Sequence, residues 1–207
     1  MGFVQAFALE QLSLIYSAHF DGFVTGDQGD NTVNGTDENE LLMGGAGDDD
    51  LNAGKGDDFL EGGTGNDYLN GGKGDDVLLA GSGNDGLYGG LGSDVLTGGE
   101  GSDRFVYRDI NESKQGSQSR DVITDFSSSE DDKIDLSAIA DDSVFIGSSD
   151  FTGTKPEIRF DDGILQLATP EFYTPLFNYY EADSAPTPIF EIQLLGVDSL
   201  SVDDLIL

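Results

Sequence analysis

The sequence predicts an all-β fold, a parallel β-roll (β-solenoid) built from a repeated nonapeptide. Nine consecutive units fill residues 26–106, and from the third unit on each fits G-G-x-G-x-D-x-U-x, where U is large and apolar and Ala twice replaces the first Gly. Asp recurs at the sixth position of these units and an apolar residue at the eighth. A fixed short period of this kind is typical of solenoid proteins.

The eighth position of each unit supplies the expected core. An apolar residue between two outward-facing ones predicts a three-residue strand with its middle side chain buried, because alternate side chains leave opposite faces. Six residues of turn and three of strand make half a coil, so strands of alternate units should stack into two parallel sheets. The column consists of Val33, Leu42, Leu51, Leu60, Leu69, Leu78, Leu87, Leu96 and Phe105.

The turns of the repeat predict metal binding. Gly at the second and fourth positions lets the backbone adopt positive φ and point carbonyl oxygens inward, toward the carboxylate of the sixth position. Such an oxygen cage suits calcium, which accepts irregular geometry more readily than magnesium does. The expected carboxylate ligands are Asp49, Asp58, Asp67, Asp76, Asp85, Asp94 and Asp103. The expected glycines are Gly45, Gly47, Gly54, Gly56, Gly63, Gly65, Gly72, Gly74, Gly81, Gly83, Gly90, Gly92, Gly99 and Gly101.

Calcium should also be needed for folding. Each ion is expected between the turns of units n and n+2, which gives roughly five to eight Ca²⁺ ions. Residues 26–106 carry 18 acidic residues against Lys55, Lys73 and Arg104, so without metal we expect self-repulsion to keep them expanded. The first two units are degenerate, since Asn31 and Glu40 replace the Asp. Asp30 and Asn31 are expected to bind calcium weakly or with altered ligands.

The N-terminal residues 1–25 form the most apolar stretch. Apolar residues at spacings near three and four indicate an amphipathic helix, which would cap the open end of the first coil or belong to a preceding domain. The stretch is too short to span a membrane, and it lacks the basic start of a signal peptide. His19 is expected to be structural or exposed.

After residue 106 the period is lost, and residues 107–207 are expected to form a β-rich cap. Strands are predicted at residues 121–126, 144–147, 157–160, 164–168 and 189–195. Asp161-Asp162-Gly163 predicts a hairpin turn between two of them, and Asp135 or Ser137 could cap a short helical turn within residues 132–139. Residues 169–188, with four of the five prolines, predict a long irregular loop.

The charge excludes several partners. The formal net charge is -32, with only nine basic residues, whereas binding to nucleic acid or an anionic membrane needs a basic face. The absence of Cys suits a protein that is exported unfolded and stabilised by metal instead of disulfides. We expect a monomer with no nucleic-acid partner and no membrane insertion.

The repeats resemble RTX (repeats-in-toxin) calcium-binding repeats. Together with Asp103-Arg-Phe-Val-Tyr107, the strand at 121–126, residues 132–139, Phe190 to Val197 and a terminal Asp-Asp-Leu-Ile-Leu, they resemble the C-terminal domain of serralysin-type secreted metalloproteases. This resemblance implies a right-handed calcium β-roll followed by a β-sandwich-like cap. It also implies an uncleaved C-terminal signal read by type I secretion machinery, and hence an extracellular or cell-surface location without a signal peptide.

No catalytic constellation is expected. The chain has no H-E-x-x-H and no G-x-S-x-G, and a single His cannot supply zinc ligands or several catalytic bases. Asp121 with Asp125, or Asp161 with Asp162, could be an acid and base pair, but solvation at turns and strand edges explains them better. We therefore expect no enzyme activity in this segment.

Two functions remain open from the sequence. The first is a calcium-triggered folding and export module from the C-terminus of a larger secreted protein. The second is a structural, adhesive or substrate-binding module, such as part of a surface-layer protein, an adhesin or a polysaccharide enzyme. The effect of deleting the last dozen residues on secretion would separate them.

Overall fold

A computed structural model describes residues 20–114, 116, 119–140, 142–149, 156–168 and 188–207. The expected N-terminal helix and most of the expected loop at 169–188 lie outside these residues, as does His19. The described part contains β-strands and two short 3₁₀ turns, η1 (Ser128–Glu130) and η3 (Val202–Asp204), and no α-helix. Within these ranges no helix has the length and apolar character needed to cross a lipid bilayer.

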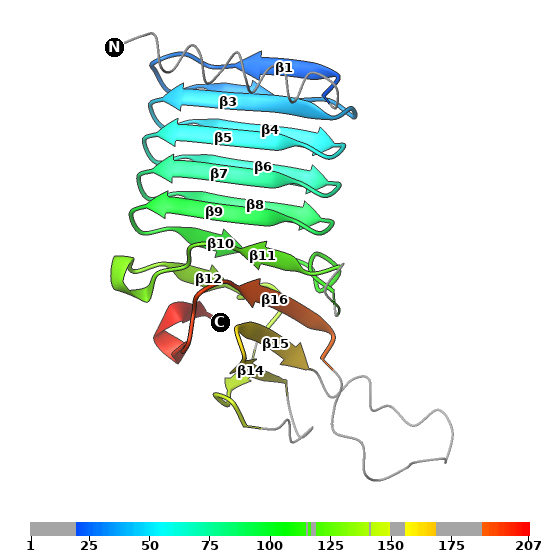
Figure 1. The fold of residues 1–207 in the computed structure, drawn as a ribbon, viewed down its shortest axis with the longest axis vertical. Coiled ribbons are helices and arrows are strands. Elements are labelled where there is room, and N and C mark those ends of the chain that lie inside the picture. The colour runs from blue at the N-terminus through cyan, green and yellow to red at the C-terminus, as the bar shows by residue number, and fades with distance from the viewer. Residues whose placement is uncertain (1–19, 115, 117–118, 141, 150–155, 169–187) are drawn as a thin grey trace, which may run out of the picture.

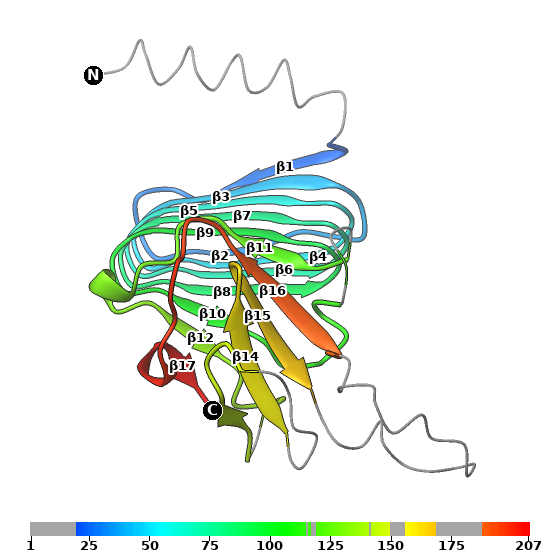
Figure 2. The ribbon, with the colours of Figure 1, turned by 60° about the horizontal axis from the view of Figure 1, so that its bottom comes forward.

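The strands form two sheets that face each other and rise as a stack of coils (Figures 1 and 2). The ten-stranded sheet has the order β1-β3-β5-β7-β9-β11-β16-β15-β14-β13, and the seven-stranded sheet has the order β17-β12-β10-β8-β6-β4-β2. In the repeats the strands are β1 (Gly22–Thr25), β2 (Thr32–Asn34), β3 (Glu40–Ala46), β4 (Asp50–Lys55), β5 (Phe59–Thr64), β6 (Tyr68–Lys73), β7 (Val77–Ser82), β8 (Gly86–Leu91), β9 (Val95–Glu100) and β10 (Arg104–Val106).

The predicted stacking of alternate units is confirmed. Odd-numbered repeat strands pair in parallel within one sheet and even-numbered ones within the other. Leu51 lies opposite Leu69, and Leu60 lies opposite Leu78. Two nonapeptides therefore complete each coil.

The strands are longer than the expected three residues. From β4 to β9 each has six residues. The first three positions of the following unit continue the strand, and the second and third of them pair with the next coil. Gly63 lies opposite Gly81, and Thr64 opposite Ser82. The turn proper shrinks to positions four to six, the segment that carries the aspartate.

The predicted core column is confirmed. The side chains from Leu42 to Phe105 at the eighth position are completely buried, and Val33 is nearly so. The column continues past the repeats through Ile123 and Ile134. A narrow core of one large side chain per strand thus runs the length of the roll.

The roll begins before residue 26, the boundary expected from the repeat. Strand β1 pairs in parallel with β3 and places Val24 opposite Leu42. Val24 therefore occupies the eighth position of a further half coil whose sequence does not fit the repeat. Its glycine and aspartate positions differ, but alternation at residues 22–25 suffices to make the strand.

The C-terminal strands continue the same two sheets. They are β11 (Asp121–Ile123), β12 (Lys133–Asp135), β13 (Val144–Phe145), β14 (Glu157–Asp161), β15 (Ile164–Ala168), β16 (Phe190–Leu194) and β17 (Leu205–Ile206). Strand β11 follows β9 and β12 follows β10, both in parallel. Asp162 and Gly163 have positive φ and join β14 to β15 in the predicted antiparallel hairpin. A separate C-terminal cap is not confirmed.

Candidate metal centre

Two hydrogen-bonded ladders of acidic side chains run up the roll, one for each set of stacked turns. In each, the backbone N–H of the sixth-position residue donates to Oδ1 of the Asp 18 residues later, as from Asp49 to Asp67 at 2.8 Å. The Asp49 ladder contains Asn31, Asp49, Asp67, Asp85, Asp103 and Asp132. The Asp76 ladder contains Glu40, Asp58, Asp76, Asp94 and Asp121.

The second carboxylate oxygen of most ladder residues has no hydrogen-bond partner. All of these aspartates are at most 3% exposed, so water does not solvate the free oxygen. Burying an ionised carboxylate without a partner is strongly unfavourable. The oxygens concerned are Oδ2 of Asp49, Asp58, Asp67, Asp76, Asp85, Asp94, Asp103 and Asp121. Each ladder is therefore a row of buried acceptors that lack a donor or a cation.

The electrostatics of the ladders reflect this deficit. Burial raises the pKa of Asp76 to about 8 and that of Asp85 to about 7. Burial likewise raises the pKa of Asp94 to about 7 and that of Asp58 to about 6, and neighbouring carboxylates add to each of these shifts. A bound cation would reverse this pattern, because it favours the ionised form.

The glycines of the repeat bring backbone oxygens to the same turns. The second- and fourth-position glycines have positive φ, as predicted, for example 114° at Gly63 and 130° at Gly65. A Cβ on Gly65 would lie 2.0 Å from the carbonyl oxygen of Gly47. The carbonyl of one turn thus faces the equivalent glycine of the next coil, and no side chain fits between them.

Carboxylate and carbonyl oxygens also converge at the first position. A Cβ on Gly44 would lie 2.4 Å from Oδ2 of Asp49 and 2.7 Å from the carbonyl oxygen of Gly62. The equivalent carboxylate and carbonyl oxygens of the following units lie beside Gly62 and Gly71. Two oxygens from successive coils therefore approach one point, and one of them is an unpartnered carboxylate oxygen.

These donors fit a hard cation. Within the described residues, no three His, Cys, Asp or Glu side chains gather closely enough to hold a metal ion by themselves, so a cation here also needs backbone carbonyls. Calcium takes six to eight oxygens from carboxylates and carbonyls. The oxygens that the repeat supplies are of these two kinds.

The first two units differ from the others as the sequence indicated. Both Glu40 carboxylate oxygens accept hydrogen bonds from Thr36, one from the backbone N–H and one from the hydroxyl. Asn31 lies in the Asp49 ladder, and its Oδ1 accepts the N–H of Asp27. Asp30 lies in the exposed fifth position, where it accepts the N–H of Asp48. None of these three residues offers a buried, unpartnered oxygen.

Sequence reasoning missed Asp121 as a ladder member. It expected this side chain to be solvated, but Asp121 is fully buried and accepts the N–H of Asp94 at 3.0 Å. Burial raises its pKa well above the usual range, and the charge of Asp94 adds to the shift. The signal was Asp121-x-Ile123, which repeats the Asp-x-apolar spacing of the sixth and eighth positions after a longer connection.

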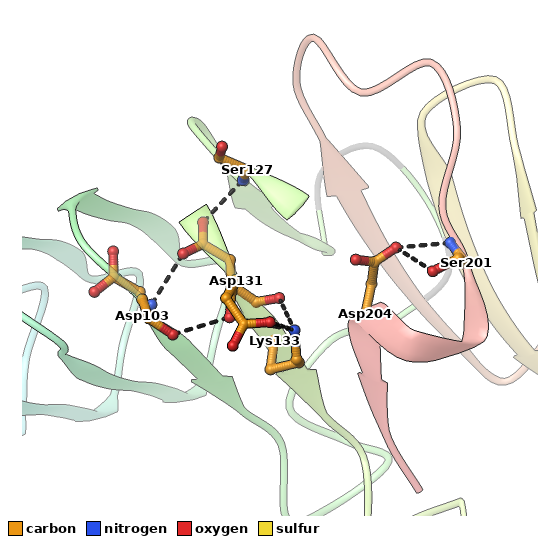
Figure 3. A network of polar contacts seen from close by, with 8 residues as sticks. Asp103, Ser127, Asp131, Lys133, Ser201 and Asp204 are labelled. Atoms are coloured by element: carbon orange, nitrogen blue, oxygen red, sulfur yellow. Dashed lines mark hydrogen bonds and ion pairs between the residues drawn. The ribbon is translucent and has the colours of Figure 1, made fainter. Parts of the chain in front are cut away.

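Asp132 ends the other ladder in a different way. Its Oδ1 accepts the N–H of Asp103 at 2.9 Å, and its Oδ2 accepts the N–H of Ser127 at 2.8 Å (Figure 3). The adjoining Asp131 is paired with Lys133. The Asp49 ladder thus ends on a carboxylate whose oxygens are both satisfied by the protein, whereas the Asp76 ladder ends on an unsatisfied one.

A comparison with protein-family models gives these repeats a name. Residues 25–60, 53–87 and 80–107 match the model of the RTX calcium-binding nonapeptide repeat. The chain contains RTX calcium-binding repeats. Seven of the eight ladder aspartates with an unpartnered oxygen, from Asp49 to Asp103, lie within the matched residues, and Asp121 lies beyond them.

Comparisons with solved structures and with curated proteins give weaker similarity. Two solution structures of subunits of the Azotobacter vinelandii mannuronan C5-epimerase are similar to this chain. The AlgE6R3 subunit is 27% identical, with a TM-score of 0.36 and coverage of 90% of this chain and 83% of its own. The AlgE6R2 subunit is 26% identical, with a TM-score of 0.35 and coverage of 88% and 90%. No curated protein matches, and the serralysin-type resemblance is not confirmed.

Proposed function

We propose that this chain is a calcium-triggered folding and export module from the C-terminus of a larger secreted protein. The observation that carries the proposal is the set of eight buried carboxylate oxygens without a partner, four in each ladder. In this proposal each RTX turn binds calcium through its sixth-position Asp and through carbonyl oxygens of its glycines. The ion supplies the positive charge that a buried carboxylate needs, so its binding energy becomes folding energy.

The ligands follow from the two ladders. The sixth-position aspartates from Asp49 to Asp103 are the proposed carboxylate ligands, with Asp121 added at the end of the Asp76 ladder. Eight unpartnered oxygens set the upper end of the expected five to eight ions. Asp30 and Asn31 are proposed as weaker ligands, since their oxygens already accept hydrogen bonds.

A calcium titration tests the folding part. The full chain in chelator should lose most of its β signal in circular dichroism and regain it between micromolar and low millimolar calcium. Magnesium at the same concentrations should be much less effective, because it demands near-ideal octahedral geometry. Full β content in excess chelator would contradict the proposal.

The export part needs a separate test. The C-terminus is proposed to be read by type I secretion machinery, which would carry the unfolded chain out of a calcium-poor cytosol to fold outside. Deleting residues 196–207 in a cell with a type I exporter should stop secretion and leave calcium binding by the RTX repeats intact. Leu205 packs in the core and β17 pairs with β12, so the deletion also perturbs the fold.

Substitutions at exposed positions provide the control for that deletion. Val202 is 53% exposed and Leu207 is 40% exposed, so Val202→Ser with Leu207→Ser should leave the roll folded. Reduced secretion of this double variant, with an unchanged calcium titration, would support a signal in the tail. Secretion of both variants at the level of the unmodified chain would refute it.

A further inference from the structure

A pocket of about 400 Å³ opens on the outer face of the seven-stranded sheet. Its lining includes Tyr68, Gly86, Arg104, Arg108, Asp135 and Ser137, and we call it the arginine pocket. None of these residues is a ladder carboxylate. The pocket therefore needs an explanation of its own, independent of calcium.

The pocket exists because one position in a row of side chains is empty. Gly86 of β8 lies between Tyr68 of β6 and Arg104 of β10 on the stacked strands. Both neighbours carry large side chains, and Gly86 carries none. Its φ is not in the positive range, so the backbone does not require glycine here. The missing side chain leaves space above the sheet. The Tyr68 ring occupies part of it, since a Cβ on Gly86 would lie 3.1 Å from Cδ2 of that ring.

The guanidinium of Arg108 is the uncommitted cation of the pocket. Its Nη2 donates to the hydroxyl of Tyr68 at 2.9 Å, and its Cζ lies 4.5 Å from the centroid of the Tyr88 ring. Among the described residues no carboxylate forms an ion pair with it. Such a cation is unusual in a chain with a net charge of -32.

Two carboxylates close to the pocket, Glu112 and Asp135, already have partners. Glu112 accepts the Tyr88 hydroxyl and the backbone N–H of Arg108, each at 2.7 Å. Asp135 accepts the N–H of Ser137 at 3.0 Å and pairs with Arg104. Within the part of the chain that the structure describes, the Tyr68 hydroxyl is the acceptor for the Arg108 guanidinium, and neither of these carboxylates pairs with it.

We propose that the arginine pocket binds a small ring-bearing monocarboxylate, of the sugar-acid class. A guanidinium presents two parallel N–H groups that match a carboxylate. The aromatic side chain of Tyr68 offers an apolar surface to the ring of the ligand. The hydroxyls of Ser137 and Tyr68 can form hydrogen bonds with the hydroxyls of that ring. The volume suits one or two sugar rings. The surrounding negative charge disfavours a long polyanion.

The test titrates the calcium-loaded full chain, followed by NMR or calorimetry, with three probes. D-glucuronate carries ring and carboxylate, acetate only the carboxylate, and D-glucose only the ring. Saturable binding of glucuronate, with weaker binding of acetate and no detectable binding of glucose, is expected. Equal affinity for acetate and glucuronate would overturn the assignment of a ring-bearing ligand, and the absence of saturable glucuronate binding would overturn the pocket as a site.

Variants locate the binding. Arg108→Gln should weaken glucuronate binding by about tenfold or more, since it removes a charged hydrogen-bond donor. Gly86→Leu should abolish binding, because its side chain fills the floor of the pocket and displaces the Tyr68 ring, while the charge of Arg108 is kept. Lys73→Gln removes a charge from the same strand as Tyr68 but outside the lining and should bind normally. Unchanged binding in both pocket variants, with normal dichroism in calcium, would refute the proposal and leave calcium-dependent folding untouched.

Discussion

The backbone N–H of Asp94 donates a 3.0 Å hydrogen bond to Oδ1 of Asp121, a residue that lies beyond the last repeat. The equivalent bond within the repeats spans 18 residues, whereas this one spans 27. The ladder therefore continues although the period has ended. Continuity of the ladder depends on the stacking of coils and not on the length of the connection between them.

Removing the charge of one ladder aspartate should stabilise the β structure of the calcium-free chain and destabilise that of the calcium-loaded chain. Asp76→Asn keeps Oδ1, which accepts the N–H of Asp58, but removes the buried charge. We expect the calcium-free chain to gain β structure and the calcium midpoint to rise at least about tenfold, as for loss of a metal-site residue. Circular dichroism at fixed pH over a calcium titration measures both.

The matched control for that variant is Asp50→Asn. Asp50 is exposed in β4 and lies outside both ladders. It should shift neither the midpoint nor the calcium-free signal appreciably. An equal effect of the two substitutions would mean that total charge, and not the buried position, determines calcium dependence.

A methyl group in the turn should destabilise the calcium-loaded roll. Gly65 has φ of 130°, and its Cβ would meet the carbonyl oxygen of Gly47 at 2.0 Å. Backbone strain alone is about 1–3 kcal/mol, so Gly65→Ala should lower the free energy of unfolding by at least that amount in urea denaturation. Gly86→Ala is the control, since its Cβ would meet only the Tyr68 side chain, at 3.1 Å, and it should change the free energy much less.

The core column should show the usual penalty for a cavity. Leu69 is completely buried, so Leu69→Ala should lower the free energy of unfolding in saturating calcium by about 2–5 kcal/mol. Leu91, which is 40% exposed, gives the comparison, and Leu91→Ala should stay within about 0.5 kcal/mol of the unmodified chain. Similar losses for both would show that the column is not the core.

The calcium-free chain should be more structured at lower pH. Burial raises the pKa of Asp76 to about 8 and of Asp85 to about 7, against 3.8 for an ordinary Asp. Groups whose pKa is raised by folding favour the folded state below the unfolded pKa, and this contribution is lost as pH rises through the folded pKa.

Dichroism of the chelated chain from about pH 5.5 to pH 8.5 should therefore show β structure decreasing with pH. Calcium affinity should increase over the same range, because protons and calcium compete for the carboxylates. The calcium-saturated chain serves as the control and should vary little. A chelated chain that gains β structure as pH rises would contradict the sign derived from the buried aspartates.

The sequence alone predicted the periodic part of the fold and the positions of the aspartates and glycines proposed as calcium ligands. The alternation of side chains around Leu51 and Leu69 correctly predicted which residues are buried. Gly63 and Gly65 indicated a backbone with positive φ, because few other residues adopt it. Val24 keeps the nine-residue spacing from Val33, but its unit lacks the glycines and the aspartate that mark the repeat. The period could not reveal Asp121, because the connection before it is longer than in the repeats. It could not reveal the arginine pocket either, because Arg108, Tyr68 and Gly86 meet only through stacking of coils.

Because successive strands alternate between the two sheets, it matters whether the number of nonapeptides is odd or even. Each nonapeptide crosses from one sheet to the other, and β11 and β12 join the sheets that contain β9 and β10. Insertion or loss of 18 residues would change the height of the stack and leave both ends as they are. Loss of nine would exchange the partners of every later strand and bring the C-terminal hairpin to the opposite wall. Natural variation in length should therefore proceed in pairs of units.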